Sequence, residues 1–160
     1  MESGVAEATF LACAGLLRLG MNKLVRPISP EIMMPAVAQG VIGVQQRVDD
    51  EEMTSILSPL NDKETEIQVM VERAFLKVLD GSCRTPIAAN ARLVDGRLVF
   101  DGLIASLDGT EILRTSREGS WSAADVLAAG TDAGDELKAK APKDFFANVP
   151  EMQGTSAWSS

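Results

Sequence analysis

The clearest hydrophobic pattern in the chain lies in its middle, between Asn61 and Gly81. Apolar residues recur there at helical spacing, and the series stops at a glycine, the residue type that most often follows a helix. Asn61 and Glu64 have the spacing of a capping box, which satisfies free amides in a first helical turn. The apolar positions are Ile67, Val71, Ala74, Phe75, Val78 and Leu79. This pattern predicts a helix over most of the segment.

Three segments with strand-like composition follow this helix. They are Ile87 to Val94, Arg97 to Ser106 and Glu111 to Ser116. The dipeptides Asp95-Gly96 and Asp108-Gly109 separate them, and such dipeptides favour tight hairpin turns. The segments therefore predict a three-stranded antiparallel meander.

An alanine-rich segment comes after the predicted strands. Ser122 and Asp125 are spaced as a second capping box, and the helical composition continues to about Ala141. We expect this helix to cover one face of the sheet, which gives an α+β unit over about residues 61–146. The last residues, 148–160, are small and polar, and we expect them to be disordered.

The first 60 residues do not make a self-contained unit by pattern. Glu7 to Leu19 is rich in apolar residues, ends before Gly20, and predicts a mostly buried helix. Val41 to Val44 predicts a short strand that is apolar on both faces and needs a neighbour on each side. Asp50 to Leu57 predicts a short helix that Ser58-Pro59 ends. We interpret the chain as a piece of a larger protein; the alternative is that these elements pack on the α+β unit.

Composition and charge exclude several classes of function. The 160 residues are 46% hydrophobic, which is enough to bury a core, and the net charge is −8 without a clustered basic region. A nucleic-acid partner is therefore not expected, because binding a phosphate backbone requires such a region. Ala8 to Leu17 is too short to cross a bilayer, and Met1 to Glu7 carries two acids and no base. We therefore expect no signal peptide, transit peptide or membrane anchor.

The chemistry open to the chain is narrow. It has no histidine, which excludes Ser-His-Asp and Cys-His pairs within this chain and argues against a transition-metal site. Its two cysteines, Cys13 and Cys83, lie in different kinds of local sequence, which favours a reducing compartment. Arg84 beside Cys83 favours a thiolate, whereas the preceding helix C-terminus disfavours it. Residue chemistry alone favours a structural cysteine over a reactive one at this position.

Three ordered blocks resemble porphobilinogen deaminases. The first is Asp-Gly-Ser-Cys-Arg-Thr-Pro-Ile at 80–87, preceded by Glu-Arg-Ala-Phe-Leu at 72–76, and it is similar to the cofactor-attachment loop of that family. The second is Met-Pro-Ala-Val-Ala-Gln-Gly-Val-Ile-Gly-Val at 34–44, which Arg47-Val48-Asp49-Asp50 continues, and the third is Ala-Gly-Leu-Leu-Arg-Leu-Gly at 14–20. The resemblance covers about Ala8 to Phe146.

The resemblance implies a division into domains. Residues 1–34 would be the end of the second domain, and residues 35–60 the returning strand and helix of the first. Both would be partial pieces of α/β domains. Residues 61–147 would be a complete C-terminal α+β domain that carries the cofactor, followed by the tail at 148–160.

The resemblance also implies a reaction and a cofactor. The family extends a dipyrromethane, held through a thioether to a cysteine, by four porphobilinogen units with loss of ammonia, and releases hydroxymethylbilane. Cys83 would be the attachment residue, with Gln39, Gly40, Leu11 and Ala12 as further cofactor-facing positions. A substrate-binding role falls to Arg18, because an arginine fork matches the acetate and propionate groups of the pyrroles. Three other charged positions, Arg47, Glu72 and Arg73, would form ion pairs between domains.

The family's catalytic aspartate and most of its substrate-binding arginines lie in an N-terminal part that has no match here. The resemblance therefore implies no catalytic residue in this chain, no metal, and little or no activity of the chain by itself. The missing half would be its structural partner within a monomer, in the cytoplasm or in a plastid stroma. Two rival interpretations are a non-catalytic acidic interaction module and a thiol-redox enzyme using Cys83, although a C-x-x-C pair is absent.

Overall fold

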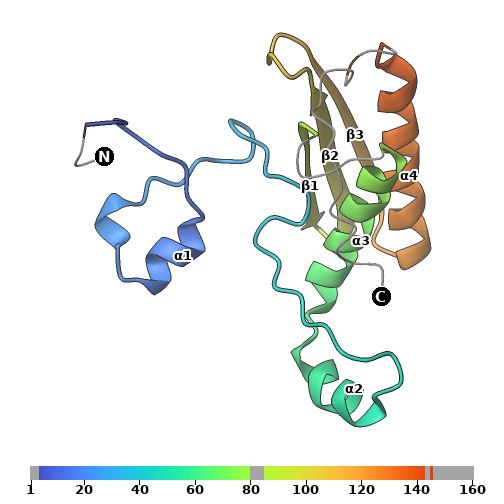
Figure 1. Cartoon of the computed structure of the whole chain (residues 1–160). Coiled ribbons are helices and arrows are strands. Elements are labelled where there is room, and N and C mark those ends of the chain that lie inside the picture. Colours follow the sequence, from blue (N-terminus) through green and yellow to red (C-terminus); the bar gives the residue numbers. More distant parts are fainter. Residues whose placement is uncertain (1–3, 80–84, 143–144, 146–160) are drawn as a thin grey trace, which may run out of the picture.

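The structure, a computed structural model, describes residues 4–79, 85–142 and 145 of the chain (Figure 1). The predicted attachment residue Cys83, the glycine expected to end the central helix and the tail at 148–160 lie outside the described residues. Within the described residues, no helix is long and apolar enough to cross a membrane.

A three-stranded antiparallel sheet forms the centre of the fold, as predicted. Its strands are β1 (Ile87–Val94), β2 (Arg97–Ala105) and β3 (Ile112–Ser120), in the order β1-β2-β3. Asp95 and Gly96 join the first two strands with φ angles of 49° and 76°. Positive φ at both central residues is the signature of a two-residue turn whose twist suits the hairpin. The second connection is a longer loop, in which Asp108 accepts hydrogen bonds from Ser106 and Thr110.

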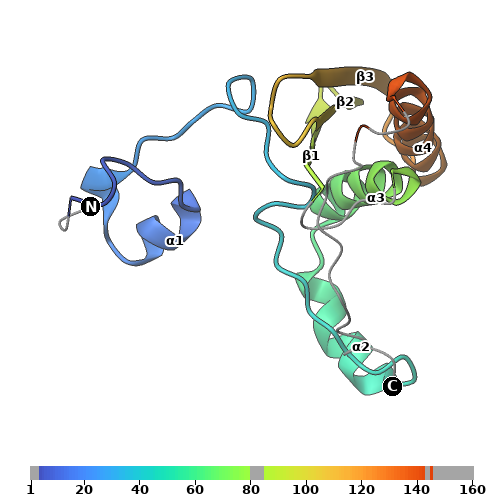
Figure 2. The same cartoon turned by 45° about the horizontal axis from the view of Figure 1, so that its top comes forward.

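Two helices cover one face of this sheet (Figure 2). They are α3 (Lys63–Val78) and α4 (Ala123–Lys140), and they also pack against each other. Ser122 caps α4 by accepting the Asp125 amide, as expected. The predicted capping box at α3 is wrong: the cap is Asp62, whose side chain accepts the Thr65 amide. Asn61 instead donates to Glu66, because the chain enters the helix one residue later than the pattern indicated.

The core lies between the sheet and these helices. Phe75 of α3 and Phe100 of β2 are fully buried and meet edge to face, with ring centroids 5.3 Å apart. Gly130 and Gly134 let α4 approach α3 closely, since a Cβ at either position would meet atoms of α3. Other core residues are Val71, Leu79, Ile87, Ala89, Ala91, Leu98, Ile104, Val126, Ala133, Leu137 and Phe145. The described residues of the α+β unit therefore enclose a packed core of their own.

The first 60 residues differ from the prediction in two places. A mostly buried helix over Glu7 to Leu19 is wrong, because α1 covers only Cys13–Arg18 and has no buried residue. The strand at Val41 to Val44 is also wrong: these residues have no regular structure, and Ile42 is 79% exposed. A strand that is apolar on both faces forms only between partners, and the described part of the chain supplies none there.

The short helices after this segment follow the expected pattern more closely. The prediction of a helix ending at Leu57 is confirmed by α2 (Glu51–Leu57), which Asp50 caps through the Met53 amide. The described residues also form two short 3-10 helices, η1 (Asn22–Leu24) and η2 (Ser58–Leu60).

The N-terminal region meets the α+β unit through a short segment. Pro35 accepts the Ala89 amide at 3.1 Å, and Ala36 forms an isolated antiparallel bridge with Ala88. Val37 packs against the core. By contrast, α1 lies well away from the sheet in both views (Figures 1 and 2). The alternative that the N-terminal elements pack on the unit therefore holds for this segment and not for α1.

Candidate functional site

A strained turn follows the segment that docks on β1. Gln39 donates to the Ala36 carbonyl at 3.0 Å, and Val41 donates to the Ala38 carbonyl at 3.2 Å. Ala38 has a φ of 57° and Gly40 a φ of 88°. The left-handed conformation is open to glycine but costs a residue with a Cβ on the order of 1 kcal/mol or more. A conformation of this kind at Ala38 persists only where neighbouring contacts hold it.

Glu72 supplies the contact that holds this turn. Its side chain projects from α3 and is only 8% exposed, and it accepts the Ala38 amide at 2.7 Å and the Ala91 amide of β1 at 2.9 Å. Burial raises the pKa of Glu72, because a buried carboxylate loses its hydration, while the two amide hydrogen bonds act in the opposite direction. One carboxylate therefore joins α3, β1 and the turn.

The turn presents polar groups to solvent. Gln39 and Gly40 are both exposed. The Gln39 side chain makes no hydrogen bond to another described residue, so its amide is available to a ligand. That a side-chain amide and backbone at these positions face the side chains of a pyrrole chain stays a prediction. β1, to which the turn is fastened, begins four positions after Cys83 in the sequence.

The other predicted site residues lie elsewhere. Leu11 is 63% exposed, and Ala12 and Arg18 are exposed at the two ends of α1. Because α1 lies away from the sheet, the structure does not bring them together with Gln39 and Gly40 (Figure 1). Among the described residues there is also no group of three or more His, Cys, Asp or Glu side chains that could hold a metal ion.

The predicted ion pairs between domains take a different form. Arg47 pairs with Asp50, three positions away, at 2.7 Å. Glu72 forms no ion pair with another described residue; its partners are backbone amides. The sequence held a signal for this role, since Glu72 directly follows Val71 in the apolar series of the helix. A carboxylate at a buried helical position needs internal hydrogen-bond donors.

Two family models match successive parts of the chain. Residues 1–55 match "Porphobilinogen deaminase, dipyromethane cofactor binding domain", and residues 66–139 match "Porphobilinogen deaminase, C-terminal domain". The chain belongs to the porphobilinogen deaminase family. The cofactor associated with this family is thus dipyrromethane. The hydrogen bond from Ala38 to Glu72 joins the two matched regions.

Curated relatives agree with these matches. The chain is 50% identical over 147 residues to porphobilinogen deaminase of Paracoccus denitrificans. The aligned residues make up 91% of the chain and 46% of that relative. It is 50% identical over 148 residues to the chloroplastic porphobilinogen deaminase of Pisum sativum, covering 91% of the chain and 40% of the relative. It is 49% identical over 148 residues to the chloroplastic porphobilinogen deaminase of Oryza sativa. This alignment covers 91% of the chain and 41% of the relative. The chain therefore spans less than half the length of these relatives.

Proposed function

We propose that the chain is the cofactor-carrying part of a hydroxymethylbilane synthase, which joins four porphobilinogen units with loss of ammonia in tetrapyrrole biosynthesis. The family membership supports this proposal. The observation on which it rests most is the attachment of the Gln39–Gly40 turn, through Glu72, to the strand that follows Cys83 in the sequence. That arrangement links two of the three sequence blocks on which the resemblance rests.

In this proposal Cys83 carries the dipyrromethane as a thioether. Sulfur is a soft nucleophile suited to the electrophilic methylene carbon that remains when a pyrrole loses ammonia. When bound, the cofactor supplies the pyrrole end on which the product is built. The exposed amide of Gln39 and the backbone at Gly40 would hold its carboxylate groups, and Arg18 would pair with a substrate carboxylate. Leu11 and Ala12 would provide apolar contacts.

The proposal keeps the expected division of the chain into residues 1–34, 35–60, 61–147 and a tail. The exposed apolar side chains of the first two regions support it, because in a larger protein they would be covered. Val48 is fully exposed, and Phe10 and Leu19 are 73% and 75% exposed. We propose the N-terminal half of the enzyme as the partner that covers them. The chloroplastic relatives support a plastid location, and the bacterial relative supports the cytoplasm.

The catalytic acid would come from that partner. No carboxylate of this chain matches the family's catalytic aspartate, so we expect no hydroxymethylbilane from the chain alone with porphobilinogen. Proton donation to the departing ammonia requires a positioned acid. Turnover by the isolated chain would contradict this part of the proposal.

The attachment role is tested by joining the chain to the N-terminal half of the Paracoccus denitrificans relative. Intact mass and hydroxymethylbilane formation would be measured for the parent, for Cys83→Ser and for the matched variant Cys13→Ser. We expect Cys83→Ser to lose both the cofactor mass and the activity, and Cys13→Ser to keep both. Undiminished product formation with serine at position 83 would overturn the assignment of the tether.

A further inference from the structure

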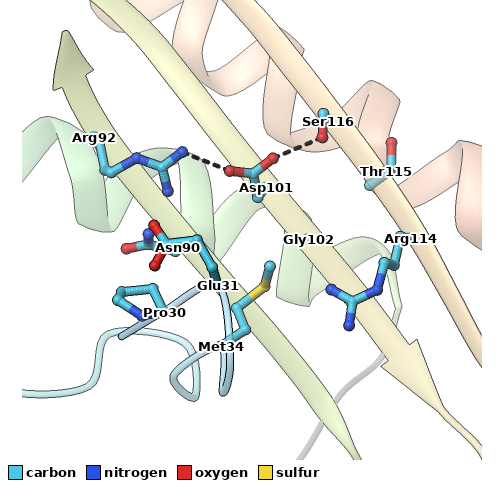
Figure 3. Close-up of a pocket in the computed structure, with 10 residues that line it drawn as sticks. All are labelled: Pro30, Glu31, Met34, Asn90, Arg92, Asp101, Gly102, Arg114, Thr115 and Ser116. Atoms are coloured by element: carbon cyan, nitrogen blue, oxygen red, sulfur yellow. Dashed lines mark hydrogen bonds and ion pairs between the residues drawn. The ribbon is translucent and has the colours of Figure 1, made fainter. Parts of the chain in front are cut away.

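A small polar cavity of about 220 Å³ lies on the face of the sheet opposite the helices (Figure 3). Its acid Asp101 is paired with Arg92 at 2.6 Å. Two further donors, Asn90 and Arg114, lie on either side of Met34 and so do not face one ligand (Figure 3). A larger hollow on the other side of the unit has a simpler chemistry.

This hollow is a groove between α3 and α4, on the outer side of the two helices. It has a volume of about 940 Å³, and the residues that line it are exposed or half-buried. The residues of α3 and α4 that face the sheet, such as Phe75 and Leu137, are by contrast fully buried. A hollow of this size lies within the range of ligand-binding clefts.

The two helices run in the same direction. Gly130 of α4 lies against Val71 of α3, and Gly134 lies against Val78, further along both helices. Lys138 near the end of α4 donates a hydrogen bond to the Val78 carbonyl at 3.0 Å. The groove therefore has one end at the C-termini of both helices and the other end toward their N-termini.

The two ends of the groove differ in chemistry. The end toward the N-termini is apolar and is formed by Val69 and Met70 of α3 and by Leu127 of α4, which is 43% exposed. The other end is basic, with Arg73 and Lys77 one helical turn apart on α3. Their side chains form no hydrogen bond or ion pair with another described residue.

The charge of the groove is opposite to that of the chain. Arg73, Lys77 and Lys138 line it together with one acid, Asp135, which leaves two net positive charges. The whole chain carries a net charge of −8. Complementary charge favours an acidic occupant with apolar side chains.

The chain itself contains a segment of this chemistry. Residues 146–160 follow Phe145, which is 8% exposed and lies beside the loop between β2 and β3. The only charged side chain of the segment is Glu151, and Met152 and Trp158 are two of its large apolar residues. Because α4 ends at Lys140, the segment starts near the basic end of the groove.

We propose that residues 146–160 dock in this groove, with Glu151 beside Arg73 and Lys77 and with Trp158 on the apolar end. The order of the groups agrees, because a chain that enters at the basic end presents Glu151 before Trp158. Along α3, Lys77 and Met70 are separated by about 10 Å, and the tail from Glu151 to Trp158 can span up to about 23 Å.

Docking requires no regular structure in the segment, for which the composition predicts none. A covered tryptophan removes a large apolar area from water, and the apolar end of the groove offers a matching surface. The charge contribution is smaller, since the cations are exposed to solvent and screened. This inference does not depend on the proposed enzyme activity.

The test uses the full chain with Trp121→Phe, which leaves Trp158 as the only tryptophan. Its fluorescence is compared with that of a synthetic peptide of residues 146–160. We expect emission at shorter wavelength and acrylamide quenching about two-fold weaker than in the peptide, because the groove shields the indole from water. Leu127→Gln should move both values toward those of the peptide.

Ile112→Gln is the matched control, because Ile112 is 49% exposed, lies on β3 and does not line the groove. It should leave the emission and the quenching of Trp158 unchanged. In the chain that keeps Trp121, Trp158→Ala should shift the amide NMR signals of Met70 and Leu127. The same spectra show whether each variant is folded.

Three results would overturn the proposal. The first is quenching of Trp158 equal to that of the free peptide. The second is an equal effect of Leu127→Gln and Ile112→Gln. The third is shielding of Trp158 that disappears on dilution, because the groove would then hold the segment of a second copy of the chain.

Discussion

The carboxylate of Glu72 accepts the backbone amide of Ala38 at 2.7 Å, although the two residues lie 34 positions apart in the sequence. The other oxygen of Glu72 accepts the Ala91 amide. A buried side chain with two backbone donors fixes a loop more firmly than surface contacts do, because breaking it leaves buried polar groups without partners. This contact is the main polar link between the turn at Ala38 and the α+β unit.

Replacement of Glu72 by glutamine should therefore be costly despite its similar shape. Glutamine keeps one acceptor but turns an NH₂ group toward the second backbone N–H. We expect Glu72→Gln to lower the free energy of unfolding by about 1–3 kcal/mol. Urea unfolding measures this loss, and hydrogen exchange at the Ala38 amide should become faster. The exposed Glu118 provides a control, because Glu118→Gln should change stability by less than about 0.5 kcal/mol.

The strain at Ala38 predicts a substitution that raises stability, in contrast to Glu72→Gln. Its φ of 57° suits glycine, so Ala38→Gly should remove the strain. Glycine also raises the entropy of the unfolded chain, and we expect a net gain of about 0.5 kcal/mol. The control is Ala36→Gly, at a residue outside the positive φ region, which should lower stability. Thermal or urea unfolding measures both variants. If Ala38→Gly lowered the free energy of unfolding as much as Ala36→Gly does, the backbone at Ala38 would not be strained.

Close packing of α3 and α4 depends on Gly130. A Cβ at this position would collide with the Val71 carbonyl oxygen and lie 3.0 Å from the Ala74 Cβ. We expect Gly130→Ala to destabilise the chain by about 1–3 kcal/mol, even though alanine is the better helix former. Gly15→Ala in α1 meets nothing within 4 Å and should not lower stability. Equal unfolding midpoints for the two variants would show that the helices can separate at no cost.

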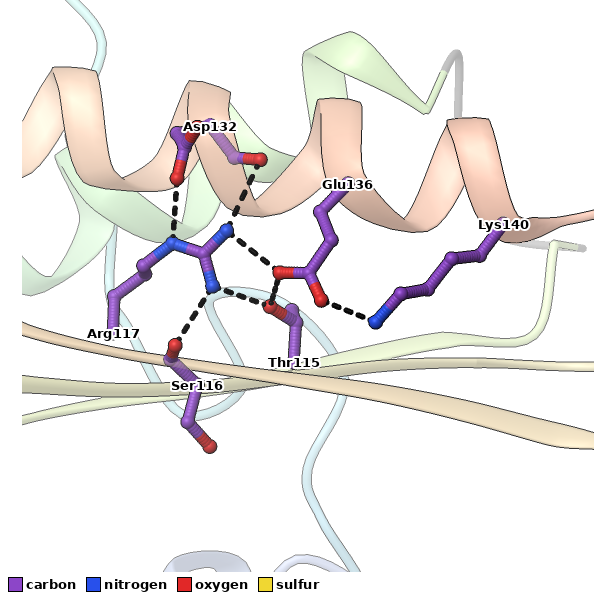
Figure 4. A network of polar contacts seen from close by, with 6 residues as sticks. All are labelled: Thr115, Ser116, Arg117, Asp132, Glu136 and Lys140. Atoms are coloured by element: carbon purple, nitrogen blue, oxygen red, sulfur yellow. Dashed lines mark hydrogen bonds and ion pairs between the residues drawn. The ribbon is translucent and has the colours of Figure 1, made fainter.

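A network of ion pairs joins β3 to α4 and predicts an acid-dependent change in stability (Figure 4). The Glu136 carboxylate accepts hydrogen bonds from Lys140, Thr115 and Arg117. These contacts lower the pKa of Glu136 from 4.5 to about 2, and Lys140 has the largest effect. The folded chain thus binds the proton of Glu136 more weakly than the unfolded chain. The stabilisation is complete above pH 4.5 and declines as the pH falls toward 2.

We expect Glu136→Gln to lower stability at pH 7 by about 1 kcal/mol, since the carboxylate is partly exposed and screened. The difference between the parent and the variant should shrink when urea unfolding is repeated at pH 3. Asp135→Asn, at an exposed neighbour on the same helix, is the control and should show no such convergence. A constant difference from pH 7 to pH 3 would contradict the role assigned to Glu136.

Much of the α+β unit could be predicted from the sequence. The spacing of Phe75 with its apolar neighbours, the Asp95-Gly96 turn and the Ser122 cap are local signals, and each was confirmed. The cap of α3 was misplaced by one residue because Asn61 and Asp62 are both good capping residues. Local patterns define an element more reliably than its first residue.

The site was predicted only in part. Gln39 and Gly40 were named from the resemblance. Glu72, which holds their turn, was expected to form an ion pair between domains. Glu72 instead binds the amides of Ala38 and Ala91, and no local pattern brings residues 38, 72 and 91 together. The cavity around Asp101 was not predicted either, because alternate positions on three strands and a crossing segment meet only in the folded sheet.

By itself the sequence determined the family, the three strands and the helices of the α+β unit, since these depend on motifs and on periodicities of neighbouring residues. The tertiary structure decided the exposure of α1, the absence of a strand at Val41 to Val44 and the role of Glu72. These features depend on which distant groups are present to pack or to donate hydrogen bonds. An apolar segment becomes a strand, and a buried carboxylate finds its donors, only when the rest of the fold supplies them.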